Sequence, residues 1–227
     1  MLAERFTRTL HQLQDVAVQA HQPTPRLLAV SKTQPAEALA ELAAAGQRAF
    51  GENYVQEAQQ KIIGLQALEL EWHLIGHLQS NKAAVAAELF DWVQTVDRAK
   101  LVDALGKARA PARTPLNVLI QVNVDGEAGK QGCRPDEIPG LAAAIGQYAT
   151  LKLRGLMAIP TPHETLEDRR PAFRAMKRLF DDLAQHAPGI DTLSMGMSDD
   201  AALAVAEGAT LVRIGTALFG ARPSKAD

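Results

Sequence analysis

The sequence predicts an α/β protein that folds as a single parallel (β/α)8 barrel of the TIM type, with an extra N-terminal helix. Short apolar runs recur along the chain, about eight of them, and nearly all are followed by a helical pattern. No Ser/Gly-rich linker divides the 227 residues, so we expect 1–227 to form one domain, with the extra helix in 1–25 and the barrel over 26–222. A doubly wound open sheet is the main alternative, because the same alternation of elements builds it.

The expected strands share a short apolar core, and they occupy residues 26–31, 47–53, 70–76, 90–96, 116–124, 153–159, 192–196 and 210–215. The run at 116–124 is the clearest of these strands because it is rich in β-branched residues. The N-terminal segment reads as an amphipathic helix and not as a signal peptide, since polar residues interrupt it throughout.

The helices between the strands are predicted from spacing and from their ends. Pro35 suits the first turn of the helix after the first strand, and Gly46 stands where its C-terminal cap belongs. Pro135 opens a later helix, and a short helix from about Ser198 to Glu207 precedes Gly208. The expected buried faces repeat every three or four residues: Leu39, Leu42 and Ala43; Val55, Ala58 and Ile62; Ile138, Leu141, Ala142 and Ile145; Phe173, Met176, Phe180 and Leu183.

Composition excludes several classes of protein. Charged residues make up 22% of the chain and the net charge is -2, which gives no broad basic field for nucleic acid. No apolar run approaches the roughly 20 residues of a membrane span. Cys133 is the one cysteine, so no disulfide framework forms within the chain, which fits a reducing cytoplasm. We expect Cys133 to be an ordinary thiol.

Lys32 is the first candidate for chemistry. It ends the buried run at 26–31, just before the helix that Pro35 opens. Both parallel-sheet folds place functional groups at the carboxyl ends of strands. Lys32 is therefore either a solvated strand terminus or an amine held in a pocket.

Two late loops have the pattern of a phosphate site. Gly196 and Ser198 follow one strand, and Gly215 and Thr216 follow the next. A glycine allows close approach of the backbone, and the hydroxyl and amide groups after it can bind an anion. The alternative is that Ser198 is only a helix N-cap. A lysine together with a phosphate cradle points to pyridoxal 5′-phosphate (PLP), an aldehyde that is also a phosphate ester.

A metal site is less well supported. His73 and His77 flank a glycine, but no acidic third ligand is near them in the sequence, so we expect no metal.

Six stretches of the chain resemble, in order, the pyridoxal phosphate homeostasis protein family: AVSKTQP, FGENYVQE, WHLIGHLQSNK, GLMAIP, SMGMSDD and VRIGTALFG. The resemblance covers about residues 26 to 222. It implies a PLP barrel of fold type III, similar to the N-terminal barrel of alanine racemase and lacking the racemase's second domain. It also implies a role in intracellular homeostasis of PLP (vitamin B6) without established turnover.

The resemblance also implies roles for particular residues. Lys32 would hold PLP covalently as a Schiff base, and Arg213 would face the pyridine nitrogen. The remaining residues implied to bind the cofactor are Asn53 near the ring's polar edge, Met157 in the ring pocket, and Met197 (through its backbone), Ser198, Gly215 and Thr216 around the phosphate.

An enzyme is the alternative reading. Arginine offers only donors, so beside the pyridine nitrogen it keeps that nitrogen unprotonated and weakens the ring as an electron sink. A racemase also needs a tyrosine on the opposite face, and the chain holds only Tyr54 and Tyr148, with no residues left for a second domain. We therefore expect a PLP-binding protein rather than a PLP-dependent amino-acid racemase or a cofactor-free phosphate-ester enzyme. PLP and amino acids are the expected ligands, and the expected state is a cytoplasmic monomer.

Overall fold

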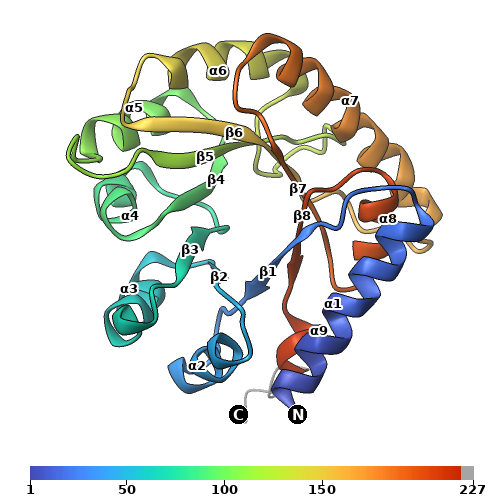
Figure 1. Ribbon diagram of the computed structural model, residues 1–227. Helices are drawn as coiled ribbons and strands as arrows, with labels where there is room; N and C mark the ends of the chain where they lie inside the picture. The colour runs from blue at the N-terminus through green and yellow to red at the C-terminus, as the bar shows by residue number, and fades with distance from the viewer. Residues whose placement is uncertain (221–227) are drawn as a thin grey trace.

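The computed structural model describes residues 1–220, in which eight parallel strands close into a barrel (Figure 1). The strands follow one another in chain order and β8 pairs with β1. Closure confirms the predicted barrel and rules out the open sheet. The strands are β1 Arg26–Val30, β2 Ala49–Glu52, β3 Glu71–Leu74, β4 Trp92–Val96, β5 Leu116–Gln121, β6 Leu151–Met157, β7 Thr192–Met197 and β8 Leu211–Ile214.

Helices surround the barrel as an outer layer (Figure 1). They are α1 Leu2–Gln19, α2 Ala36–Ala44, α3 Val55–Gly64, α4 Ala83–Leu89, α5 Ala99–Ala108, α6 Ile138–Gly146, α7 Arg170–His186, α8 Ala201–Ala206 and α9 Thr216–Phe219. Within residues 1–220, none of these helices has the length and apolar character needed to cross a membrane.

The extra N-terminal helix is confirmed. In α1, Phe6, Leu13 and Ala17 are buried at spacings of seven and four residues, which makes one apolar stripe. That stripe packs against α2, α8 and α9, so α1 runs along the side of the barrel where β8 and β1 meet (Figure 1).

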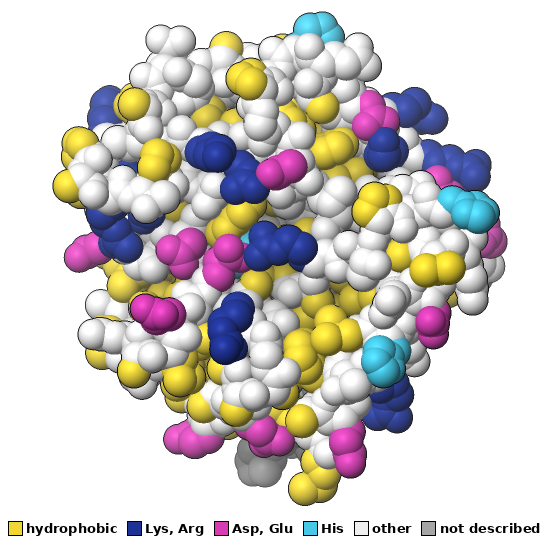
Figure 2. Space-filling view, viewed as in Figure 1, with side chains coloured by type: hydrophobic (Ala, Val, Ile, Leu, Met, Phe, Trp, Pro, Cys, Tyr) yellow, Lys and Arg dark blue, Asp and Glu magenta, His cyan; other side chains and the backbone are white. Residues whose placement is uncertain are grey.

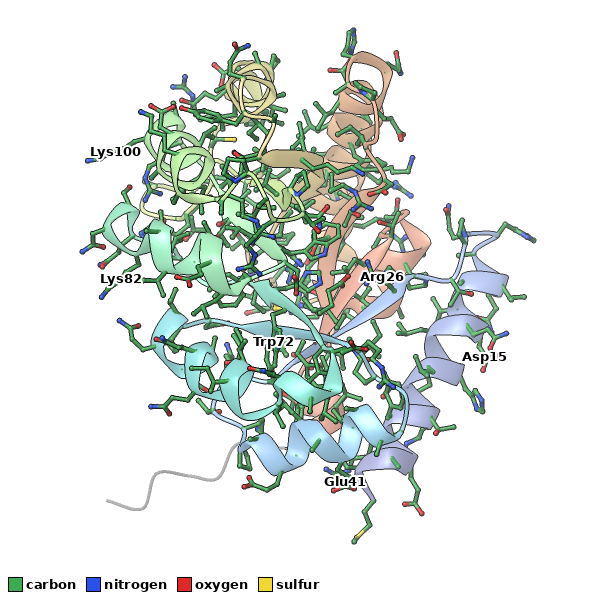
Figure 3. The ribbon with its side chains drawn as sticks, turned by 60° about the vertical axis from the view of Figure 1, so that its left-hand side comes forward. Asp15, Arg26, Glu41, Trp72, Lys82 and Lys100 are labelled. Carbon is green, nitrogen blue, oxygen red and sulfur yellow. The ribbon has the colours of Figure 1, made fainter. Side chains whose placement is uncertain are left out.

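Most of the apolar core lies between the strands and the helices. Phe50 and Trp72 meet there with ring centroids 5.9 Å apart, and Figure 3 shows Trp72 within the molecule while Lys82 and Lys100 reach outward. The barrel interior holds two smaller apolar clusters, because alternate strand residues face inward. One consists of Leu28, Ala49, Ile75 and Leu211 with Val30 against them, and the other of Trp92, Leu119 and Met157.

Two sequence predictions about helices are wrong in detail. The helix expected from Ser198 begins at Ala201, because β7 continues to Met197 and Asp200 occupies the N-cap position. In α3 the buried position is Lys61 and not Ile62, which is only partly buried. The cap at Gly46 is confirmed: its φ of 107° lies in the region that favours glycine.

Charge is mixed on the surface. Figure 2 shows basic and acidic side chains interspersed over the middle of the face in view, with hydrophobic side chains among them. This pattern agrees with the net charge of -2.

Candidate functional site

Lys32 lies in the turn that follows β1, at the carboxyl end of the barrel. Leu28 and Val30 face the barrel interior, and Lys32 follows Val30 by two residues. Its side chain is half-buried. On either side of β1 lie β2 and β8, so the loops that follow those two strands flank Lys32.

The turn is strained and is held from outside the barrel. Thr33 has a φ of 64°, an unfavourable value for a β-branched residue. Its N–H donates to Oε1 of Glu57 at 2.6 Å, a contact that fixes the backbone just after Lys32. Strain of this kind persists only where surrounding contacts enforce it, and it is typical of functional sites.

A buried ion pair fixes the backbone just before Lys32. The Lys61 ammonium donates to the Ser31 carbonyl oxygen and to Oε1 of Glu52, each at 2.8 Å, and Ser31 Oγ donates to Glu52 Oε1 at 2.6 Å. Burial raises the pKa of the Glu52 carboxyl, while its hydrogen bonds from Lys61 and Ser31 oppose that rise. The sequence analysis missed Lys61, since a lysine on a predicted helix is expected to be exposed.

The two glycine-containing loops come together, as the phosphate interpretation requires. Ser198 Oγ accepts a hydrogen bond of 3.5 Å from the N–H of Ala217, so the loops after β7 and β8 touch. Gly215 lies against Val30, the last residue of β1. Thr216 is exposed and Ser198 is half-buried. Lys32, Thr216 and Ser198 therefore follow three neighbouring strands.

Of the two acidic residues in this loop, Asp200 has its charge compensated, whereas Asp199 is exposed. Oδ1 of Asp200 accepts from the Met197 N–H at 2.7 Å, and Oδ2 accepts from Arg169 at 2.8 Å. The Asp200 carboxylate is buried and paired. The Met197 amide already has an acceptor, so the phosphate role implied for that amide requires it to give up Asp200 or to share its proton.

Arg213 lies inside the barrel and is almost fully buried. It donates to Ser194 Oγ and to the carbonyl oxygen of Ala158, each at 2.8 Å. Burial lowers the pKa of its guanidinium to about 10, which leaves it protonated at neutral pH. A guanidinium has five N–H donors, and these two bonds leave three for a ligand.

The other two implied residues lie at different depths. Asn53 directly follows β2 and is half-buried beside the Lys32 turn; its backbone is so close to Gly76 that a Cβ there would lie 2.1 Å from the Asn53 oxygen. Met157, at the end of β6, is fully buried in the inner cluster with Trp92 and Leu119.

Features outside this arrangement are structural. Burial raises the pKa of the Cys133 thiol to about 12, so the thiol is unreactive. Within residues 1–220 no group of His, Cys, Asp and Glu could hold a metal ion, and His73 is buried while His77 is exposed. A cavity of about 820 Å³ lies between α6 and α7 on the outside of the barrel, away from Lys32.

The parallel barrel belongs to the class of the alanine racemase N-terminal domain. The family model described as "Alanine racemase, N-terminal domain" matches residues 6–223. An alanine racemase from Corynebacterium glutamicum, only 16% identical, shares the fold with a TM-score of 0.71 over 99% of this chain and 63% of that chain.

Closer relatives narrow the class. Pyridoxal phosphate homeostasis proteins from Haemophilus influenzae and Pseudomonas aeruginosa are 53% and 51% identical, covering 89% and 97% of this chain and 87% and 96% of their own lengths. PipY of Synechococcus elongatus, 40% identical, has been solved without PLP and with PLP bound, with TM-scores of 0.87 and 0.83 over 97% of this chain and 100% of that chain. The chain belongs to the pyridoxal phosphate homeostasis protein family.

Proposed function

We propose that this chain binds pyridoxal 5′-phosphate at the carboxyl end of its barrel, with Lys32 as the covalent attachment point, and serves to hold the cofactor in balance within the cell. The observation that carries the proposal is the adjacency of three strand ends: Lys32 after β1, Gly215 and Thr216 after β8, and Ser198 after β7. Relatives named for PLP homeostasis and the PLP-bound PipY support it.

The residues at the site match the three polar ends of PLP. An amine at Lys32 suits the aldehyde, hydroxyl and amide groups of the Ser198 and Thr216 loops suit the phosphate, and Arg213 has N–H donors to spare for the ring nitrogen. Arg169 neutralises Asp200, which removes one of the two acidic charges next to Ser198 that would repel a phosphate. When bound, PLP supplies an electrophilic carbonyl and a conjugated ring that accepts electrons.

Each residue has one task in this proposal. Lys32 Nζ bonds to the aldehyde carbon as a Schiff base, and the aldehyde oxygen leaves as water. Glu57 and Lys61 hold the backbone on the two sides of Lys32, which keeps the amine at the barrel mouth. Asn53, on the β2 side of Lys32, lies near the polar edge of the cofactor ring in this proposal. Met157, in the barrel interior, lines the ring pocket.

A holding role fits the residues better than amino-acid racemisation. Protonated Arg213 can only donate, so a ring nitrogen beside it stays unprotonated and withdraws electrons weakly. Tyr148 donates its hydroxyl proton to Asp103 at 2.9 Å, on the outside of the barrel near α5 and α6. Tyr54 is 60% exposed. Neither tyrosine is placed within the barrel as a second base.

The remaining parts of the proposal concern the protein in its cell. We expect it to act as a single-domain monomer in the cytoplasm and to admit amino acids as a second class of small ligand.

Absorbance during titration with PLP tests the proposal, because a Schiff base between PLP and lysine absorbs in the visible range. Wild type and Lys82→Ala should develop the same visible band and bind PLP equally well. Lys32→Ala should lose the band and keep only weak binding. A visible band that survives Lys32→Ala, or no PLP binding by wild type, would overturn the proposal.

A further inference from the structure

A line of hydrogen bonds crosses the barrel interior from β3 to β8. Glu71 Oε1 lies 2.7 Å from His73 Nε2, and His73 Nδ1 lies 2.8 Å from Gln94 Nε2. Ser194 Oγ then donates to Gln94 Oε1 at 2.7 Å and accepts from Arg213 at 2.8 Å. All members except Glu71 are buried, and they come from β3, β4, β7 and β8.

The two ends of this line constrain the directions of the bonds in it. Arg213 can only donate, so Ser194 must accept from it and can give its own proton to Gln94. Glu71, which also accepts from Arg26 at 2.6 Å, can only accept when ionised. Burial raises the pKa of Glu71, but the hydrogen bonds from His73 and Arg26 lower it further than burial raises it. Glu71 therefore stays ionised.

With Ser194 donating to Gln94, one hydrogen arrangement satisfies the whole line. His73 Nε2 must carry a proton to donate to Glu71. His73 Nδ1 must be bare, because the amide oxygen of Gln94 is already committed to Ser194 and its NH₂ group therefore faces His73. A proton on both ring nitrogens would place two donors against each other. His73 is thus neutral, with its proton on Nε2.

Burying these polar groups in the barrel interior is unfavourable in free energy. Two apolar clusters fill much of the barrel interior around this line, and burying polar groups is unfavourable compared with apolar ones of the same shape. Packing alone does not require Gln94 and Ser194. What they provide is a fixed acceptor for Arg213.

We propose that Gln94 and Ser194 are positioning residues that hold the Arg213 guanidinium in place for the ring nitrogen of the cofactor, with the bond direction set by Glu71 through His73. This inference rests on the proposed function. Gln94 and Ser194 do not touch the ligand; they act through Arg213. Loss of either removes or loosens one of the two bonds that hold Arg213, the other being to the Ala158 carbonyl oxygen, and so weakens only the bond to the ring nitrogen.

Nitrogen NMR on protein labelled with ¹⁵N-histidine tests the line without any ligand. His73 is the one buried histidine in residues 1–220. Its ring-nitrogen signals can therefore be assigned as those that do not shift with pH when the signals of the exposed histidines do. We expect a neutral ring with the proton on Nε2 and a hydrogen-bonded, bare Nδ1. A proton on Nδ1, or a ring that titrates with the exposed histidines, overturns the inference even if PLP binds.

Ligand selectivity tests the positioning role. Ser194→Ala and Gln94→Met should each weaken PLP roughly tenfold, as for one lost bond to a charged group, and should leave the affinity for 1-deaza-PLP, which has CH in place of the ring nitrogen, within about twofold. Thr95→Val is the matched control, because Thr95 is the buried neighbour of Gln94 and bonds to the backbone of Gly76. It should change neither affinity.

Equal weakening of PLP and 1-deaza-PLP, or no weakening of PLP, would mean that Gln94 and Ser194 serve structure alone. If melting curves show that one of the two variants fails to fold, the ligand affinities of the other variant test the positioning role. Failure of wild type to bind PLP would defeat the proposed function and with it the positioning role, while the NMR result would still stand for the hydrogen-bond line.

Discussion

The ammonium group of Lys61 lies 2.8 Å from Oε1 of Glu52, and both side chains are buried directly beside the turn that carries Lys32. Lys61→Met should therefore leave Glu52 buried without its counter-ion and cost about 3–5 kcal/mol of unfolding free energy. The double change Glu52→Gln with Lys61→Met removes both charges and should recover much of that loss. Urea unfolding measures the free energy of unfolding of the wild type, of Lys61→Met and of the double variant.

An exposed pair provides the control. Lys177 and Asp181 form an i,i+4 pair on α7, and Lys177→Met should cost no more than about 1 kcal/mol. If Lys61→Met were equally mild, the buried pair would not be what holds the Lys32 turn.

The phosphate cradle is tested by single hydroxyl deletions. Ser198→Ala and Thr216→Ala should each lower PLP affinity roughly tenfold or more, because each removes one hydrogen bond to a charged group. Pyridoxal, which lacks the phosphate, should be nearly indifferent to both changes. Thr210→Ala, at the opposite end of β8, serves as the control and should alter neither affinity. Equal losses for both ligands would show that the hydroxyls are structural.

Acid should destabilise the protein through His73. Burial lowers the pKa of this histidine below its ordinary value, and a bond to Glu71 opposes the shift only in part. The unfolded chain therefore binds the proton more readily. Stability is complete above about pH 6.5 and falls below it, by up to about 1.4 kcal/mol per pH unit for this one group.

Urea unfolding at pH 8.0 and pH 5.5 measures the effect, with His73→Gln as the comparison. The variant should lose less stability than wild type over this interval. An identical loss would mean that His73 is protonated equally well in the folded and unfolded chains.

Turnover of amino acids should be slow or absent. Arg213 leaves a ring nitrogen unprotonated, and Tyr148 is tied to Asp103 outside the barrel, so α-proton removal lacks both an electron sink and a second base. Deuterium exchange at the α-carbon of alanine and serine in heavy water measures this step, with an alanine racemase as positive control. Exchange at a racemase-like rate that disappears in Lys32→Ala would favour an enzyme.

The barrel was predictable because each strand and each helix carries its own local signal. The alternation of apolar runs with helical stripes is visible in sequence, and so are Lys32, Ser198 and Thr216 at strand ends. Their closeness follows from the parallel topology, since neighbouring strands end at the same side of the barrel.

The residues that support the site were not predictable in the same way. Lys61 looks like a surface helix residue, and its burial depends on Glu52 in β2 and on Ser31 just after β1. Gln94 and Ser194 lie 100 positions apart and meet only when the barrel closes. Arg169 reaches Asp200 from the far end of another loop. Such contacts are set by tertiary structure and leave no local pattern.

Borohydride reduction of the PLP-loaded protein, followed by peptide mass mapping, tests the central claim most directly. Reduction converts the carbon–nitrogen double bond between lysine and cofactor into a stable single bond, so the pyridoxyl group stays on its lysine. We predict that the label is on Lys32 and that Lys32→Ala abolishes it. A label on Lys82 or Lys130 in the wild-type protein, with Lys32 unmodified, would contradict the account.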